Sequence, residues 1–329
     1  MHISFSSYFQ DPQNGLPLKL TIVRNKGDHI MEGAFSNEFN SYPIIDGIPR
    51  FVISKNNYSN SFGFQWGKWP TIQFESENKG KPMEGHTLKM FNIITDSKMC
   101  ELSEDDIILD IGCGSGRFID VIKNSFNNKI VGIDYSSAVQ VAYNSFKHNP
   151  NICIVQADAL TLPFKSNIFN AAYSIGVLHH TPNPYKGIQE ANRCLKSNGW
   201  FGLSVYSKDS YYARPILIKY RKIFKILMPF LSYLPPLLYS YFTIYIIRII
   251  SLKVRMFRPF ILKYFPYVAL ADLKWSILDT FDSVTPIHAS THATEEVNNW
   301  LDKAGFFKIK QSDWWKVSFI ATKVIQKNE

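Results

Sequence analysis

The hydrophobic pattern alternates between strand-length apolar runs and amphipathic helical stretches from Asp106 onward. The apolar runs are IILDIG (107–112), KIVGID (129–134), NICIVQAD (151–158), FNAAYSIGVL (169–178) and GWFGLSVYS (199–207). The helical stretches between and after them are 113–126, 136–148, 184–195 and 293–306. FKIKQSDWWKVSFIATKV (307–324) predicts two closing strands. Strands alternating with helices at this spacing predict a doubly wound α/β sheet that is mostly parallel, with the last strand antiparallel.

Two segments depart from this alternation and divide the chain. Residues 1–75 predict a small N-terminal β module, in which SYPIIDGIPRFV (41–52) carries the Asp-Gly pair of a hairpin. The aromatic segment SFGFQWGKWP that follows is expected to pack this module onto its neighbour. Residues 208–268 predict a helical insertion broken by prolines. The core is therefore expected over 76–207 and 269–329.

The positive charge of the chain is concentrated in the insertion. The chain has 329 residues and a formal net charge of +9. Between Lys208 and Phe265 there are eleven Lys/Arg and one acid, whereas the rest of the chain holds 25 basic and 26 acidic residues. The same segment is the most apolar and aromatic part of the protein. Because nucleic-acid-binding surfaces are usually basic and polar, this combination favours an anionic membrane surface over nucleic acid as a partner.

The insertion contains 22 consecutive uncharged residues, 226–247, enough by length to cross a membrane. The last two strands must nevertheless join the same sheet as the first five, which a single crossing would prevent. Pro235 and Pro236 are also expected to split the run into pieces of roughly ten residues, about 15 Å each, which is half of a hydrocarbon core. A crossing is therefore disfavoured. A helical lid over a substrate pocket and a membrane-interface element both remain open.

Glycines follow the first strand of the alternating region, in the motif DIGCGSG. Gly112, Gly114 and Gly116 allow a sharp turn and close approach of a ligand, and the following helix directs its amide groups at the crevice. Asp134 ends the next strand, where a carboxylate can bind ribose hydroxyls. The dinucleotide fingerprint G-x-G-x-x-G fails, because Arg117 or Ile119 stands where its third glycine belongs. A nicotinamide-dependent dehydrogenase is therefore disfavoured.

The motifs LDIGCGSGRF, VGIDYS, QADALTLPF, SIGVLHHTPNP and LKSNGWFGLSVY together resemble class I S-adenosylmethionine-dependent methyltransferases of the type 11 group, which have a Rossmann-like fold. The resemblance implies S-adenosyl-L-methionine as cofactor. It implies that Asp110 and the three glycines surround the methionine moiety. It places Asp134 at the ribose, Tyr135 beside the adenine, Asp158 with Ala159 at the adenine edge, and Ile175 with Gly176 along the cofactor slot.

The N-terminal module resembles the zinc-ribbon-like segment that precedes some of these domains, especially at YPIIDGIPRFV. Its cysteines are missing, since no cysteine occurs before Cys100. We therefore expect the module to bind no metal. The four cysteines form no CxxC pair and the first residues show no signal-peptide pattern, which predicts a cytoplasmic protein that is peripheral on the inner face of the membrane if the insertion binds lipid.

Histidines are the candidates for a general base. His179 and His180 follow the fourth strand, at the mouth of the predicted crevice. The stretch 279–292 resembles one beside the substrate opening in the family and adds Asp282, His288 and His292. In each case a purely structural role, or a solvated loop around a helix-capping Thr294, remains open. Asn183-Pro184-Tyr185 lies too late for the Asn-Pro-Pro-Tyr motif of nucleobase amino-methyltransferases.

These features favour methylation of a small-molecule or lipid-linked acceptor, at oxygen or carbon rather than at a nucleobase nitrogen. A prenylated quinone precursor or a lipid-linked sugar would suit the membrane-interface alternative. Two other functions remain open. One is an RNA methyltransferase that uses the basic insertion as its footprint. The other is a non-catalytic protein that binds the cofactor to support a partner.

Overall fold

The computed structural model describes residues 1–52 and 58–324. The N-terminal residues form an antiparallel sheet of β1 (Lys19–Lys26), β2 (His29–Ser36), β3 (Ser41–Ile45) and β4 (Ile48–Pro49), paired in chain order. The predicted hairpin is confirmed at the turn between β3 and β4, where Asp46 and Gly47 have φ angles of 50° and 81°. Two left-handed residues give the turn the twist that neighbouring strands need. The likeness of this module to a zinc ribbon stays a prediction.

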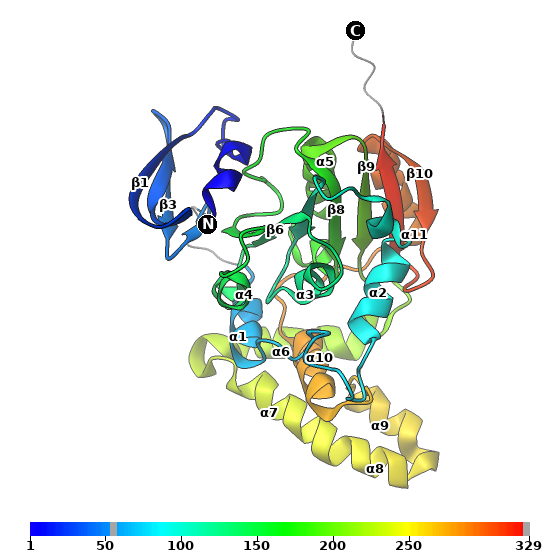
Figure 1. The fold of residues 1–329 in the computed structure, drawn as a ribbon. Helices are drawn as coiled ribbons and strands as arrows, with labels where there is room; N and C mark the ends of the chain where they lie inside the picture. The colour runs from blue at the N-terminus through cyan, green and yellow to red at the C-terminus, as the bar shows by residue number, and fades with distance from the viewer. Residues whose placement is uncertain (53–57, 325–329) are drawn as a thin grey trace.

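The N-terminal sheet lies beside the main domain (Figure 1), and aromatic side chains pack across the junction. The Phe9 ring lies 4.8 Å from Phe35 within the module and 5.4 Å from Phe164 across the junction. The backbone N–H of Phe51 donates to the carbonyl of Gln156, at the end of the outermost strand of the main sheet. The segment SFGFQWGKWP has a different place from the one expected. It forms α1 (Asn60–Lys68), which packs against α4 and α10 below the main sheet.

The main sheet has seven strands and the predicted fold class is confirmed. They are β5 (Ile107–Ile111), β6 (Lys129–Asp134), β7 (Ile152–Gln156), β8 (Phe169–Ile175), β9 (Leu195–Ser204), β10 (Phe306–Gln311) and β11 (Ser318–Lys323). Their order is β10-β11-β9-β8-β5-β6-β7, with β5 to β9 parallel and β11 antiparallel to both neighbours. The order reverses between β5 and β8, where ligands of open α/β sheets bind.

Helices cover both faces of this sheet, which explains why its strands are apolar throughout. Along β5, Leu109 and Ile111 pack into the core under α5 (Pro184–Cys194) and α11 (Thr294–Lys303). Ile108 points to the opposite face and packs with residues of α2 (His86–Ile94), α3 (Arg117–Lys123) and α4 (Ala138–Phe146). Gly305 follows α11 with a φ of 91°, as expected for the residue after a helix C-terminus.

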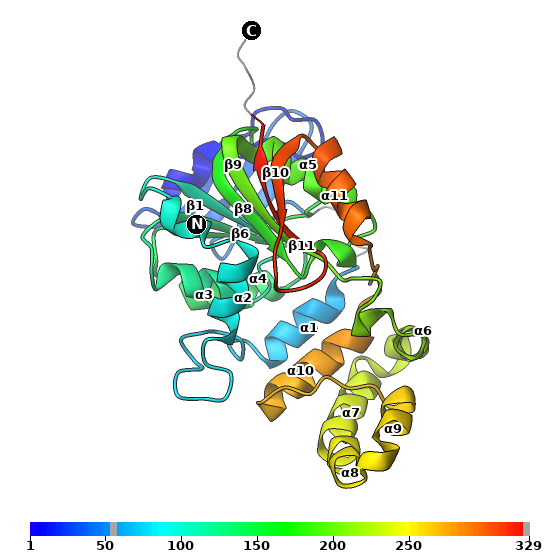
Figure 2. The same ribbon diagram turned by 90° about the vertical axis from the view of Figure 1, so that its right-hand side faces the viewer.

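The insertion forms a helical layer beyond one end of the sheet (Figures 1 and 2). It comprises α6 (Pro215–Leu231), α7 (Leu234–Phe242), a π-helical turn (Thr243–Ile247), α8 (Arg248–Lys253) and α9 (Arg258–Tyr264). Next along the chain, α10 (Leu273–Val284) returns beneath the sheet and packs against α6 and α7. The solvated loop considered for the start of the 279–292 stretch is therefore wrong for 279–284, which is helical.

Several prolines of the insertion lie in the first turn of a helix, whereas Pro229 lies inside α6. Pro215 begins α6, and Pro235 and Pro236 stand in the first turn of α7, where their missing N–H groups have no partner to lose. The uncharged run 226–247 is therefore divided at Ser232 and Tyr233, just before the proline pair, but the pieces are unequal. Residues 226–231 end α6, and the rest belong to a helix that continues without a break from Leu234 to Lys253. Within the described residues, this 20-residue helix is long and apolar enough to cross a membrane by length and composition, and 33% of its most apolar window is buried.

Candidate active site

The glycine motif forms a tight turn between β5 and α3. Gly112, Gly114 and Gly116 all have left-handed backbones, with φ angles of 84°, 55° and 98°. A Cβ on Gly112 would lie 2.3 Å from the side chain of Val177, and one on Gly114 would lie 2.8 Å from Nε1 of Trp66. Larger residues are excluded by both conformation and space, so the turn keeps its backbone open toward the cavity.

Asp134 ties the end of β6 to this turn. One oxygen of its carboxylate accepts from the N–H of Gly114 at 2.9 Å, and the other accepts from the N–H and hydroxyl of Ser136 at 2.8 and 2.6 Å. Burial raises the pKa of Asp134, and these three hydrogen bonds oppose the rise. The side chain still lines the pocket, so the predicted ribose-binding group is placed where a ligand can reach it.

Asp110 lies beneath the turn rather than in the pocket wall. Its side chain is 2% exposed and its Oδ2 atom has no hydrogen-bond partner within the described structure. Burial raises its pKa to about 8, against the opposing effects of the Tyr173 hydroxyl and the Arg117 guanidinium. The site therefore holds an unsatisfied buried acceptor immediately behind the glycines.

An aromatic pair stands on the side of the pocket where the resemblance places adenine. The ring of Tyr58 stacks on that of Tyr135 with centroids 4.7 Å apart, and the Tyr58 hydroxyl donates to Oδ1 of Asp158 at 3.1 Å. Asp158 also accepts from the N–H of Leu160 at 2.9 Å. Tyr58, Tyr135 and Ala159 line the pocket, while Asp158 stands behind them.

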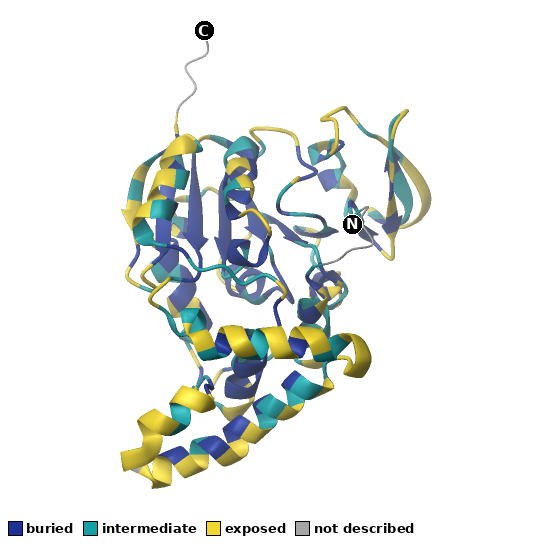
Figure 3. Cartoon of the chain, turned by 180° about the vertical axis from the view of Figure 1, so that it is seen from behind, coloured by how far each residue is buried: buried dark blue, intermediate teal, exposed yellow. Residues whose placement is uncertain are grey.

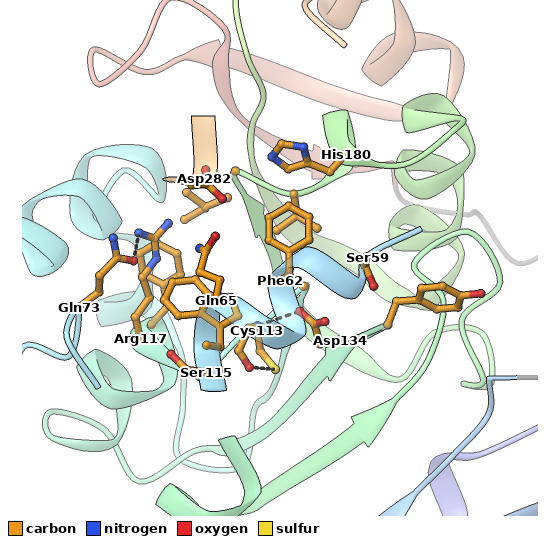
Figure 4. Close-up of a pocket in the computed structure, with 18 of the residues that line it drawn as sticks. Ser59, Phe62, Gln65, Gln73, Cys113, Ser115, Arg117, Asp134, His180 and Asp282 are labelled. Atoms are coloured by element: carbon orange, nitrogen blue, oxygen red, sulfur yellow. Dashed lines mark hydrogen bonds between the residues drawn. The ribbon is translucent and has the colours of Figure 1, made fainter. Parts of the chain in front are cut away.

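The pocket lies where α1, the glycine turn, the ends of β6 and β8 and helix α10 meet (Figure 4). It contains about 1270 Å³ of space, counted up to its opening to solvent. Seven of the ten predicted cofactor residues line it: Gly112, Gly114, Asp134, Tyr135, Ala159, Ile175 and Gly176. Asp110, Gly116 and Asp158 stand behind the lining.

Acidic side chains from α10 form the opposite wall. Asp279 and Asp282 lie three residues apart on one helix and both line the pocket. Oδ1 of Asp279 accepts from Nε2 of Gln73 at 3.3 Å, and Gln73 in turn accepts from Nη1 of Arg117 at 2.8 Å. Oδ2 of Asp282 accepts from the hydroxyl of Tyr206 at 3.3 Å. Figure 4 shows Asp282, Arg117 and Gln73 on the same side of the cavity.

Burial makes these carboxylates easier to protonate. It raises the pKa of Asp279 to about 7, an effect reinforced by the neighbouring Asp282 and opposed by Arg117. Burial also raises the pKa of Asp282, against the Gln65 amide and the Tyr206 hydroxyl. Near neutral pH, Asp279 can therefore exchange a proton with a bound molecule.

The histidines are placed less favourably for that task. His179 is completely buried outside the pocket lining, and its ring lies 3.7 Å from that of Tyr206. His180 does line the pocket, but its Nδ1 bonds to the carbonyl of His288 at 2.8 Å and burial lowers its pKa to about 3. His288 and His292 lie outside the lining, and His292 contacts Ser290 and Glu296.

The sequence did not point to many of the other residues that line the pocket. The missed lining residues are Phe62, Gln65, Trp66, Gln73, Arg117, Tyr206, Tyr212, Trp275 and Asp279. Two signals were available. Arg117 was the residue that broke the dinucleotide fingerprint, and SFGFQWG placed four aromatic and amide side chains on one short helix. Residues 1–52 and 58–324 contain no group of three or more His, Cys, Asp or Glu side chains positioned to hold a metal ion.

Residues 109–203 match the family model described as "Methyltransferase domain". The chain is 36% identical over 107 residues to the uncharacterized protein MJ1252 of Methanocaldococcus jannaschii, covering 32% of this chain and 39% of that protein. It is 32% identical over 107 residues to the uncharacterized methyltransferase At2g41040, chloroplastic, of Arabidopsis thaliana, covering 30% of each. It is 28% identical over 163 residues to demethylmenaquinone methyltransferase of Staphylococcus haemolyticus, covering 48% of this chain and 62% of that one.

The matched stretches thus span between 30% and 62% of these relatives' own length. Among solved structures, a possible histamine N-methyltransferase of Thermotoga maritima aligns with 81% of this chain and 98% of its own, at 16% identity and a TM-score of 0.44. That similarity is too low to bear on the chemistry of the site.

Proposed function

The chain carries a class I S-adenosylmethionine-dependent methyltransferase domain with a Rossmann-like fold, and on that premise we propose that it methylates a small-molecule or lipid-linked acceptor. The observation that carries the proposal is the meeting of two sets of residues in one pocket. The glycine turn with Asp134 forms one wall, and Asp279 with Asp282 forms the other. The first set suits the methyl donor and the second suits an acceptor that must lose a proton.

The residues present fit S-adenosylmethionine. The turn at Gly112 and Gly114 leaves a cradle that a Cβ would fill, and Asp110 holds an unsatisfied oxygen behind it. Asp134 would hold the ribose, and Tyr135 with Ala159 would flank the adenine. The bound cofactor supplies an electrophilic methyl group on a positively charged sulfur. The pocket lining contains three aspartates, Asp134, Asp279 and Asp282, and one arginine, although the chain as a whole is basic. This excess of acidic groups suits a cationic ligand.

We assign removal of the acceptor's proton to Asp279, assisted by Asp282, in place of the histidines. A base works best when its pKa lies near the working pH, and such proton transfer contributes about 10²–10⁴-fold to rate. Asp279 meets this condition with a pKa of about 7, whereas His180, with a pKa of about 3, is a much weaker base. The carboxylates can accept a proton from a hydroxyl or an activated carbon, so O- or C-methylation suits this wall.

Methylation of a nucleobase nitrogen is less well supported. Asn183 caps α5 by accepting from the N–H of Lys186 at 3.1 Å, and it lies outside the pocket lining. The relatives carry names as different as demethylmenaquinone methyltransferase, sterol 4-C-methyltransferase and tRNA U34 carboxymethyltransferase. The acceptor must therefore be found by experiment.

The test uses the full chain with methyl-labelled S-adenosylmethionine and the aqueous and organic fractions of a cell extract. We expect a labelled product in one fraction. Replacing Asp279 by Asn should slow its formation by about 100-fold or more, while Asp302→Asn on the exposed side of α11 should have no effect. If wild type binds S-adenosylhomocysteine but labels neither fraction, methyl transfer is contradicted and a non-catalytic cofactor-binding role is favoured.

A further inference from the structure

Many residues of the helices α6 to α9 are exposed (Figure 3), and large apolar side chains are numerous among them. The layer is attached to the rest of the molecule mainly through α10, which packs against α6 and α7. Its own buried clusters are small and centre on Leu217 and Phe224 in one case and on Ile244 and Ile247 in the other. Many of the large apolar side chains of the layer are therefore exposed instead of being buried in a core.

One outward stripe runs along the continuous helix from Leu234 to Lys253. Leu234, Leu238 and Phe242 are 53%, 58% and 41% exposed, and Tyr245 and Ile249 continue the row at 47% and 49%. Steps of three and four residues place these side chains on one face of a helix. A helix at a water-facing surface normally reverses this pattern and puts its polar residues outside. From Leu234 to Ile249 the stripe extends over about 23 Å of helix, at about 1.5 Å per residue.

The neighbouring helices add the most exposed apolar residues of the layer. Phe230 near the end of α6 is 83% exposed and Ile226, one turn earlier, is 68% exposed. Met256 and Phe260, before and within α9, are 81% and 62% exposed. We call the exposed apolar residues of the stripe, of α6 and of residues 256–264 the insertion face. Isolated apolar residues on a surface are normal, but this many large, exposed apolar side chains on neighbouring helices point to an interaction site.

Charge identifies the partner that fits the insertion face. Residues 210–271 contain ten Lys/Arg and no Asp or Glu. Lys219, Lys222 and Lys225 are exposed on α6, between the apolar residues. Lys253, Arg258 and Lys263 are exposed at the opposite end of the layer. A second copy of this surface would bring like charges together, and a nucleic acid would leave the large apolar side chains in water.

We propose that the insertion face seats this protein on the surface of an anionic lipid bilayer, with its apolar side chains at the boundary between headgroups and acyl chains. Interfacial helices combine an apolar face with Lys/Arg in this way, and basic residues near the surface attract anionic lipid. The helix from Leu234 to Lys253 lies along the layer instead of crossing the bilayer. The chain after it returns through α10 to add β10 and β11 to the same sheet as β5 to β9.

This surface lies next to the candidate active site. Helix α10 packs against α6 and α7, while its Asp279 and Asp282 line the pocket. Arg221 of α6 turns inward and donates from Nε to the carbonyl of Ser283 at 2.8 Å. A bilayer bound to the insertion face would therefore adjoin α10, the helix whose Asp279 and Asp282 we assign to the acceptor. The binding itself does not depend on the identity of the acceptor or on methyl transfer.

The test is co-sedimentation of the full chain with vesicles of phosphatidylcholine alone or with one third phosphatidylglycerol, at low and high salt. We expect binding to the anionic vesicles at low salt that falls at least tenfold at high salt or with neutral vesicles. Replacing Phe230, Met256 and Phe260 by Ser should reduce binding at least tenfold. The matched control replaces Val23 and Phe39, which are 75% and 66% exposed in the N-terminal module, and should bind like wild type.

Three results would overturn the proposal: no sedimentation at low salt, equal loss in the control variant, or a lipid-free dimer that the triple variant abolishes. The last result would assign the insertion face to a second copy of the chain. Titration with S-adenosylhomocysteine in the absence of vesicles serves as the separate readout of the active site. The triple variant should retain that binding, so failure of the membrane proposal and failure of the methyltransferase proposal are distinguishable.

Discussion

The ring of Tyr58 lies stacked on the ring of Tyr135, with centroids 4.7 Å apart and an angle of 17° between the planes. The same tyrosine donates its hydroxyl to Asp158. One residue from the connection between the N-terminal module and α1 thus contacts both groups that the motifs assign to adenine. A residue that comes before the matched stretch 109–203 therefore completes the side of the pocket where the resemblance predicts adenine.

Removal of the Tyr58 ring should weaken cofactor binding. Stacked aromatic pairs contribute about 0.5–1.5 kcal/mol, so we expect Tyr58→Ala to bind S-adenosylhomocysteine about three- to tenfold more weakly in a calorimetric titration. Tyr58→Phe keeps the ring and serves as the matched control, with a smaller loss. Tighter binding by Tyr58→Ala would contradict this interpretation, because it would show that the tyrosine occupies the place of the ligand.

A methyl group on Gly112 should be poorly tolerated. The left-handed backbone and the contact with Val177 both oppose Gly112→Ala, and strain of this kind costs about 1–3 kcal/mol. We expect a lower melting temperature and at least tenfold weaker binding of S-adenosylhomocysteine. Gly67→Ala is the matched control, since nothing lies within 4 Å of its added Cβ and the helical residue has an ordinary φ. Equal effects at the two positions would contradict the interpretation of the glycine turn as a cradle for the cofactor.

The rate of methyl transfer should rise with pH through about 7 and level off above it. Asp279 must be deprotonated to accept the acceptor's proton, and its pKa of about 7 reflects burial, with Asp282 raising it and Arg117 lowering it. The pH profile of the single-turnover rate should lose this rise in Asp279→Asn. A wild-type profile that is flat between pH 5 and 9, or one that the variant retains, would assign the base elsewhere.

Asp11 should stabilise the N-terminal module through its charge. It is completely buried, and its carboxylate accepts from the hydroxyl of Tyr42 at 2.6 Å and from the amides of Asn37 and Asn40 at 2.9 and 2.8 Å. In Asp11→Asn, an NH₂ group would replace one of the accepting oxygens and would face donors with which it cannot form hydrogen bonds. We expect a loss of about 1.5–3 kcal/mol in the free energy of unfolding, whereas the exposed Asp28→Asn should change it little.

This effect should depend on pH in a defined direction. Burial alone would raise the pKa of Asp11, but its hydrogen bonds with Tyr42, Asn40, the Gln13 N–H and Asn37 together hold it below the ordinary value. The stabilisation is therefore present above an unfolded pKa of about 3.9 and is lost as pH falls through the lower folded value. Chemical denaturation at pH 7 and pH 3 should show a smaller difference between wild type and Asp11→Asn at the acid end.

The alternating core could be predicted because each of its elements has a local signal. Strands such as β5 and β6 are buried on both faces and therefore appear in the sequence as short apolar runs. Between β5 and α3 the backbone has left-handed conformations that favour glycine. The hairpin at Asp46-Gly47 is equally local. For such elements, a few neighbouring residues contain the physical cause of the structure.

The pocket wall around Asp279 could not be predicted from the sequence, because its residues meet only through the tertiary fold. Gln73 links Arg117 to Asp279, which lies 206 residues further along the chain than Gln73. The paired prolines of the insertion predict the helix break that lies just before them, at Ser232 and Tyr233, but they give no local signal that the next helix continues to Lys253. His179 and His180 have a histidine's local signal for a base, but their contacts with the carbonyl of His288 and the hydroxyl of Ser290 come from a stretch more than 100 residues away.

The measurement that tests the central claim most directly is calorimetric titration of S-adenosylhomocysteine into wild type and Asp134→Ala, each shown to be folded by its thermal unfolding transition. We predict binding by wild type that weakens at least tenfold in the variant, about 1.4 kcal/mol. Absence of binding to folded wild type, or equal affinity in folded Asp134→Ala, would contradict the assignment of this pocket to S-adenosylmethionine.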